Sequence, residues 1–207
     1  MEDQTVRRTY RLFSDMLEYP SSDLRGRVEE CAELLSTVNH QAARRLRKFQ
    51  ALVQDTPSSR LEEVYTGTFD LQVVCYPYVG YQLFGESYKR GAFMVGLKEQ
   101  YRQCGFSEGN ELPDHLGVLL RFLAILDDAE ASQEIATVCL MPSLEKMALA
   151  FKEKDQPYGH VILALLGFLK GIYPGVGDSA VTRTVAEPWH SAPMGCQLGQ
   201  GVDHDAR

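Results

Sequence analysis

Hydrophobic and polar positions follow a helical period along most of the chain, and the clearest stretch runs from Pro113 to Leu126. Its apolar residues recur every three or four positions and form one wide face: Leu112, Leu116, Leu119, Leu120, Leu123 and Leu126. Pro113 suits the first turn of a helix, and Asp114 puts a negative charge at the positive end of the helix dipole. The pattern predicts a buried helix that begins near Pro113, with His115 at the margin of its apolar face.

The other segments show the same period and are separated by proline, glycine and small polar residues. The expected helices cover residues 5–18, 24–38, 42–53, 61–69, 75–85, 86–104, 113–126, 129–140, 144–151 and 158–172. Breaks are expected near Asn39 and at Met141-Pro142-Ser143, and no run of alternating β-branched residues predicts a strand. The expected fold class is all-α: a single-domain bundle of about nine to ten helices over residues 1–172, with a helix at 158–172 in its centre.

Composition limits the kinds of protein that this chain can be. Its 207 residues are 44% hydrophobic and 24% charged, which is ordinary for one folded domain. The net charge of −7 disfavours nucleic acid as a partner and favours a basic peptide. The start of the sequence does not resemble a signal peptide and the apolar runs are too short to span a bilayer, so we expect a cytoplasmic protein without stable membrane insertion. Glycine, proline and small polar residues predict a flexible tail over residues 173–207.

The sequence offers little catalytic chemistry. No nucleotide-binding, hydrolase or metalloprotease motif occurs. The five cysteines include no Cys-x-x-Cys pair, and His190, Cys196 and His204 in the tail, near Trp189, match no metal-ligand spacing. We therefore expect no catalytic residue, no cofactor and no metal site.

Two features have both a structural and a functional interpretation. Arg90 falls on the apolar stripe of its predicted helix and needs a carboxylate partner, for which Asp70 and Asp114 are the candidates. The segment from Tyr76 to Phe84 holds four aromatic rings, which serve a core as readily as a contact surface. Either interpretation is compatible with the sequence.

Three motifs in this order resemble a known family. They are Tyr65-Thr66-Gly67-Thr68-Phe69-Asp70, then Leu83-Phe84-Gly85 with Arg90-Gly91, and then Glu111-Leu112-Pro113-Asp114-His115-Leu116. From about Tyr10 to about Tyr173 the chain resembles the NarJ branch of the NarJ/TorD/DmsD family. Members of that family are dedicated chaperones of molybdenum-cofactor oxidoreductases.

The resemblance implies a function and a partner. Such chaperones bind the N-terminal peptide of the catalytic subunit, of nitrate reductase or a related enzyme, and favour cofactor insertion before membrane docking or export. The expected protein is thus a monomer or weak homodimer that binds a molybdoenzyme subunit. A structural subunit retained in the mature oxidoreductase complex is the alternative function.

The resemblance also implies a set of peptide-binding residues, in which Asp114 and His115 lie beside the segment from Tyr65 to Asp70 and near Arg90. A carboxylate at a helix start is held ionised by the helix dipole, so Asp114 can face a cationic peptide end without an internal partner. Apolar members would anchor the peptide and acidic members would orient its basic end. The set is Tyr65, Phe69, Asp70, Tyr81, Phe84, Arg90, Glu111, Asp114, His115 and Leu119.

Overall fold

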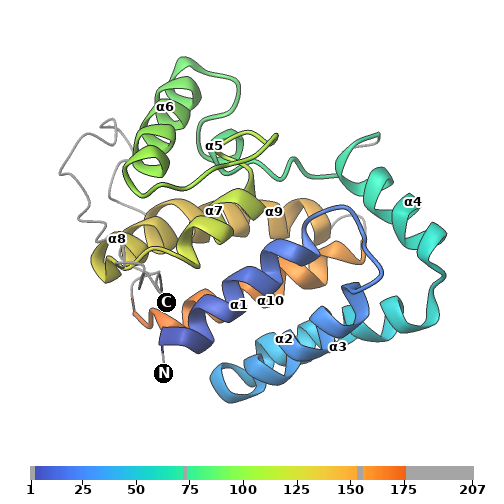
Figure 1. The fold of residues 1–207 in the computed structure, drawn as a ribbon. Coiled ribbons are helices and arrows are strands. Elements are labelled where there is room, and N and C mark those ends of the chain that lie inside the picture. The colour runs from blue at the N-terminus through green and yellow to red at the C-terminus, as the bar shows by residue number, and fades with distance from the viewer. Residues whose placement is uncertain (1–2, 72–73, 153–155, 176–207) are drawn as a thin grey trace, which may run out of the picture.

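The computed structural model describes residues 3–71, 74–152 and 156–175, which are mainly helical (Figure 1). The elements are α1 (Asp3–Met16), α2 (Leu24–Val38), α3 (His40–Asp55), α4 (Ser58–Phe69), α5 (Val79–Phe84), α6 (Tyr88–Gln103), α7 (Leu116–Leu123), α8 (Ala129–Glu134), the π-helical η1 (Ile135–Leu140), α9 (Met141–Lys152) and α10 (Tyr158–Ile172). No β-strand occurs within these ranges, so the predicted all-α fold is confirmed. Most of the predicted tail, from residue 176 onward, lies outside the described residues.

Helix α10 is buried on most of its circumference. It packs against α3 and α9 and also contacts α1 and α2. Its buried residues are Tyr158, Gly159, Val161, Ile162, Ala164, Leu165, Leu166, Phe168 and Leu169. A helix that is apolar on nearly all sides is stable only when other elements surround it, which explains its central position.

Asn39 joins α2 to α3 and caps the second of these helices. Its backbone is extended, and its side-chain oxygen accepts hydrogen bonds from the backbone N–H groups of Gln41 and Ala42. Its side-chain amide donates to the carbonyl oxygen of Gly167 in α10, at 2.9 Å. The predicted break therefore produces a tight helical hairpin that is fixed directly to the central helix.

The break predicted at Met141-Pro142-Ser143 is wrong, because the chain passes from α8 through η1 into α9 without leaving the helical conformation. In a regular α-helix the ring of Pro142 would clash with the carbonyl group four residues earlier. The wider π-helical turn just before it, in which the Met141 N–H bonds to the Ala136 carbonyl, changes this register. The sequence signal for a break is thus accommodated inside one continuous helical run.

Helices α1 and α7 pack side by side near the middle of the bundle, while α5 and α6 cover one end and α4 lies at an edge (Figure 1). The hydroxyl of the buried Ser143 in α9 has a single proton, which it shares between the carbonyl oxygen of Cys139, at 2.8 Å, and that of Val79 in α5, at 3.3 Å. Gly85 ends α5 with φ of 62°, a conformation that favours glycine. These contacts fix the short aromatic helix α5 on the bundle, beside the start of α7.

Candidate functional site

The turn before α7 is held by the segment before α5 through backbone hydrogen bonds. The N–H of Val79 donates to the carbonyl oxygen of Asp114 at 2.7 Å, and the N–H of Leu116 donates to that of Pro77 at 2.8 Å. These bonds form an isolated bridge between Tyr78 and His115. Because the bridge keeps this part of the turn extended, α7 begins at Leu116, and the prediction of a helix start near residue 113 is wrong.

Arg90 and Asp114 form a bidentate ion pair under this turn. The Nε of Arg90 lies 2.8 Å from Oδ2 of Asp114, and its Nη2 lies 3.3 Å from Oδ1. The Asp114 side chain is fully buried, whereas 19% of the Arg90 side chain is exposed. The hydrogen bond to Asp114 raises the pKa of Arg90. Of the two partners considered for Arg90, Asp114 is the one observed, so this carboxylate is held by an internal partner and does not face the peptide directly.

Two tyrosine rings cover the guanidinium of Arg90. Its central carbon lies 5.2 Å from the ring centre of Tyr78 and 5.8 Å from that of Tyr81. Distances of this size allow a cation–π attraction, which is stronger where water is excluded. The ion pair and the two rings therefore hold α5, α6 and the turn together as one rigid support.

His115 caps α7 and is 6% exposed. Its Nδ1 accepts a hydrogen bond from the backbone N–H of Gly117 at 3.2 Å, so the proton of the neutral ring belongs on Nε2. The ring meets that of Tyr78 edge to face, at 5.5 Å between centres. Burial lowers the pKa of His115 despite the opposing influence of Glu111. His115 is thus a neutral structural cap whose ring also packs against the aromatic segment.

Tyr65 and Tyr78 lie within electrostatic range of two carboxylates at the surface above this support. Burial raises the pKa of both Tyr65 and Tyr78, and the carboxylates of Asp70 and Glu111 raise it further in both residues. The end of α4 and the turn before α7 therefore lie close enough to act on the same two hydroxyl groups. Both carboxylate residues are exposed. We call this the aromatic–acidic surface, formed by Tyr65, Asp70, Tyr78, Tyr81 and Glu111.

Exposed apolar side chains extend the aromatic–acidic surface. Tyr76 is 44% exposed and its ring lies 4.6 Å from that of Tyr81, while Leu112, next to Glu111, is 45% exposed. On the other side, Tyr19 is 56% exposed and its ring lies 5.6 Å from that of Tyr65. Large apolar groups that remain in water beside acidic groups are typical of a protein-binding surface.

The remaining predicted residues lie beneath or beside this surface. Leu119 is fully buried in the core, and Phe69 is 7% exposed and packs against Tyr65. Phe84 packs against Phe93, with ring centres 5.6 Å apart. Tyr78 contacts both Arg90 and His115, yet the predicted set omits it. Its place in the dense aromatic segment was the available signal, but the pattern alone did not show which ring meets the turn.

Two negative findings concern the described residues only. Within residues 3–71, 74–152 and 156–175, no helix has the length and apolar character that crossing a membrane requires. In the same ranges, histidine, cysteine and acidic side chains do not gather in threes as a metal site requires. The predicted scatter of His190, Cys196 and His204 lies outside the described residues.

The fold itself has a counterpart of known structure. The crystal structure of a protein from Archaeoglobus fulgidus, described as a redox enzyme maturation protein, matches with a TM-score of 0.54 and 23% identity. The match covers 79% of this chain and 93% of that one. At this level of identity the likeness defines the fold alone, an all-helical bundle.

Sequence comparison defines the family. The family model described as nitrate reductase delta subunit matches residues 32–164, and the chain belongs to that family. NarJ of Bacillus subtilis, named as a nitrate reductase molybdenum cofactor assembly chaperone, is 29% identical over 83% of this chain and 92% of its own length. NarJ of Escherichia coli K12, with the same description, is 26% identical over 85% of this chain and 74% of its own. The resemblance given by the three motifs is confirmed, and these relatives are assembly chaperones rather than catalysts.

Proposed function

We propose that the protein is a cytoplasmic chaperone for the catalytic subunit of a molybdenum-cofactor enzyme, a nitrate reductase or a related oxidoreductase. It binds the N-terminal peptide of that subunit and assists cofactor insertion before membrane docking or export. The observation that supports peptide binding is the exposure of large apolar side chains, Tyr19, Tyr76 and Leu112, on the surface that also carries the exposed carboxylates of Asp70 and Glu111. The names of the relatives support the enzyme class.

The aromatic–acidic surface fits a peptide that has apolar residues next to basic ones. Tyr76, Tyr81 and Leu112 offer exposed apolar area for the anchors, and aromatic side chains lose little conformational entropy on binding. Asp70 and Glu111 offer carboxylates for lysine or arginine side chains, which orient the peptide and speed its encounter with the chaperone. The buried Arg90–Asp114 pair acts indirectly, because it holds the rings in place.

Calorimetric titration of the N-terminal peptide of the catalytic subunit encoded by the same organism tests the proposal. We expect a dissociation constant in the micromolar range or below. Replacing both Asp70 by Asn and Glu111 by Gln should weaken binding by about 1 to 3 kcal/mol, with a smaller loss at high salt. Glu33→Gln is the matched control, since Glu33 is exposed on α2 and lies outside the surface. The absence of binding heat for the wild type, together with no copurified subunit, would reject the proposal.

The alternative of a retained structural subunit predicts a different composition of the mature enzyme. A chaperone leaves after assembly, so the purified membrane-bound or exported enzyme should lack this chain. Gel filtration of the isolated chain should show a monomer or a weak homodimer. Finding the chain in a one-to-one ratio with the catalytic subunit in mature enzyme would favour the alternative.

A further inference from the structure

A cavity lies where the end of α10 meets α1 and α8. Its volume is about 570 Å³, a usual size for a binding pocket. We call it the hydroxyl cavity, and the lining residues that matter here are Val6, Tyr10, Leu126, Ser132, Ile172 and Tyr173. None of the residues that line it belongs to the aromatic–acidic surface. The hydroxyl cavity is therefore a separate feature of the molecule.

The hydroxyl cavity combines apolar walls with polar groups at a few points. Leu126 is buried, and Val6 and Ile172 are partly buried against the core. The hydroxyl groups of Ser132 and Tyr173 lie 3.4 Å apart between these walls. A pocket of this kind suits a ligand that has a large apolar body and one polar group.

The third hydroxyl group, that of Tyr10, lacks a hydrogen-bond partner among the described residues although its oxygen is buried. Only 1% of Tyr10 is exposed. Burial raises the pKa of Tyr10, and Tyr173 and Ser132 lie close enough to affect this pKa, but neither makes a hydrogen bond to the Tyr10 oxygen. A buried polar group without a partner destabilises a protein. A hydrogen-bond donor that entered the cavity would complete this set of hydroxyl groups.

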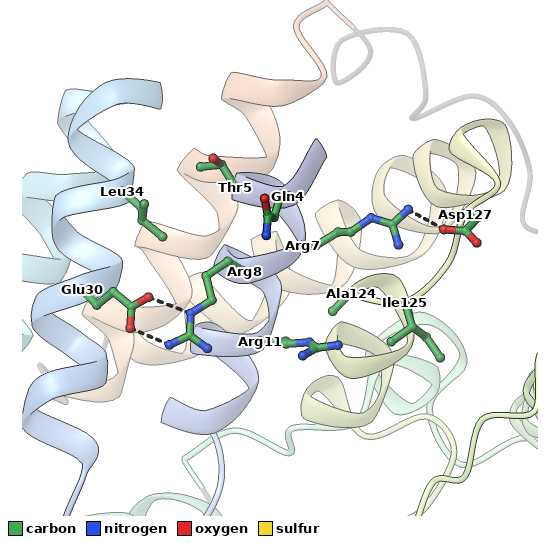
Figure 2. Close-up of a pocket in the computed structure, with 10 residues that line it drawn as sticks. All are labelled: Gln4, Thr5, Arg7, Arg8, Arg11, Glu30, Leu34, Ala124, Ile125 and Asp127. Carbon is green, nitrogen blue, oxygen red and sulfur yellow. Dashed lines mark hydrogen bonds and ion pairs between the residues drawn. The ribbon is translucent and has the colours of Figure 1, made fainter. Parts of the chain in front are cut away.

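An ion pair separates the hydroxyl cavity from an open groove along α1. Figure 2 shows this pair, in which Nη2 of Arg7 lies 2.8 Å from Oδ1 of Asp127. Both residues line the cavity as well as the groove. Arg11 lines the groove about 6 Å further along the helix. It is exposed, and it makes no ion pair or side-chain hydrogen bond within the described part of the chain, so its charge is available to an acid near the cavity.

The chain itself continues from the edge of the hydroxyl cavity. Pro174 lines the cavity, and residues 176–207 follow it outside the described residues. The only tryptophan of the chain, Trp189, comes 14 residues after Gly175. Its indole has a large apolar body and one N–H donor, which is the chemistry that the cavity fits. A ligand on so short a linker has an effective concentration on the order of millimolar, so even a weak site is occupied.

We propose that the hydroxyl cavity binds the indole of Trp189 from the same chain. Glu187 lies two residues before Trp189, and two extended residues span about 7 Å. Glu187 can therefore pair with Arg11 in the groove while Trp189 fills the cavity. A guanidinium group binds a carboxylate through two parallel hydrogen bonds, which fixes the direction of the segment. The inference does not depend on the proposed function, because the cavity and the aromatic–acidic surface share no residue.

Fluorescence of the full-length chain tests this contact directly, because Trp189 is its only tryptophan. With excitation at a wavelength that tyrosine does not absorb, the folded protein should emit at shorter wavelength than the protein unfolded in urea. Acrylamide should quench the folded protein several-fold less efficiently, since a buried ring is shielded from the solvent. Ser132→Phe fills the cavity from α8 and should remove both differences. Ser59→Phe is the matched control, because Ser59 is exposed on α4 and does not line the cavity.

Charge reversal tests the second contact of the segment. Arg11→Glu should increase the quenching of Trp189, because Glu187 would then face a like charge. Adding Glu187→Arg to this variant should restore the wild-type value. Without that reversal, the pairing of Glu187 with Arg11 would be wrong.

Three results would overturn the proposal. The first is equal emission and equal quenching of the folded and unfolded protein. The second is shielding that Ser132→Phe leaves unchanged, because Trp189 would then be buried elsewhere. The third is shielding that increases with protein concentration, because the indole would then enter the cavity of a second copy. If circular dichroism showed that Ser132→Phe alters the fold, Val6→Phe, which fills the cavity from α1, decides in its place.

Discussion

The carboxylate of Asp114 is fully buried and bonded to the guanidinium of Arg90, so the acid of the family motif faces inward. An acid at this position can influence peptide binding only through the structure that it supports. The pair joins the turn before α7 to α6, and Tyr78 and Tyr81 lie over its positive partner. Experiments on Asp114 should therefore reveal a loss of stability first.

Asp114→Ala should lower the free energy of unfolding by about 3 kcal/mol, because it leaves Arg90 mostly buried without its partner. Asp114→Asn should cost less, since one acceptor for the guanidinium remains. Urea unfolding measures both values, and Arg90→Met added to Asp114→Ala should recover part of the loss. If Asp114→Ala cost no more than Glu33→Ala at an exposed position of α2, the pair would have no structural role.

The sequence predicted the helices much better than it predicted their junctions. Helical periods and the break at Asn39 depend on local preferences, and α10 begins and ends where the apolar pattern does. The start of α7 and the continuity through Pro142 depend on partners far away in sequence, a backbone bridge to Tyr78 and a π-helical turn. Local propensity has no information about such partners.

The candidate site shows the same division. The motifs implied that Arg90, Asp114 and His115 lie near one another, and the structure places them so. They did not show that Asp114 is buried, because a carboxylate at a predicted helix start is usually exposed to solvent. They also did not select Tyr78 from the rings around it, since that choice depends on how the segment before α5 crosses the turn. Burial and contact between distant segments were the missing information.

The stability of the protein should depend on pH through His115. Burial lowers its folded-state pKa below the ordinary value of 6.5. Below about pH 6.5 the unfolded chain therefore binds a proton that the folded chain resists, and stability declines as the pH falls. Above that pH the ring is neutral in both the folded and the unfolded state, and its contribution to the free energy of unfolding is complete. Protonation of Nδ1 would also remove the acceptor that caps Gly117.

Urea unfolding at pH 7.5 and 5.5 of wild type and His115→Asn measures this effect. Asparagine is a good helix cap but does not titrate. The stability of wild type relative to the variant should decrease on acidification by up to about 1.4 kcal/mol per pH unit below 6.5. A constant difference between the two proteins would show that His115 titrates equally in the folded and unfolded states.

Leu119→Ala should affect the core rather than the peptide. The side chain is fully buried in α7, and removing a leucine from such a position costs about 2 to 5 kcal/mol. At temperatures below the unfolding transition, the folded variant should bind the N-terminal peptide of the catalytic subunit with nearly wild-type affinity. Calorimetric titration beside thermal unfolding separates the two effects. Loss of affinity in a fully folded variant would mean that Leu119 takes part in binding.

At Gly80 in α5 the backbone lies close to the buried ion pair. A Cβ atom added at this position would lie 2.7 Å from Oδ2 of Asp114, 3.0 Å from Cδ1 of Phe93 and 3.2 Å from Cγ of Arg90. All three neighbours are held by packing or by the ion pair, so none can move freely. The absence of a side chain at Gly80 is therefore required for α5 to lie on this pair.

Gly80→Ala should destabilise the protein by about 1 to 3 kcal/mol through overpacking. It should also weaken peptide binding, because displacement of the ion pair moves Tyr78 and Tyr81. Gly67→Ala in α4 is the matched control: a Cβ there meets no atom within 4 Å, and alanine favours a helix interior, so this change should stabilise by about 0.5 to 1 kcal/mol. Chemical unfolding and peptide titration of both variants decide the matter. If Gly80→Ala equalled Gly67→Ala in both stability and peptide affinity, the close contact at Gly80 would support neither the fold nor the aromatic–acidic surface.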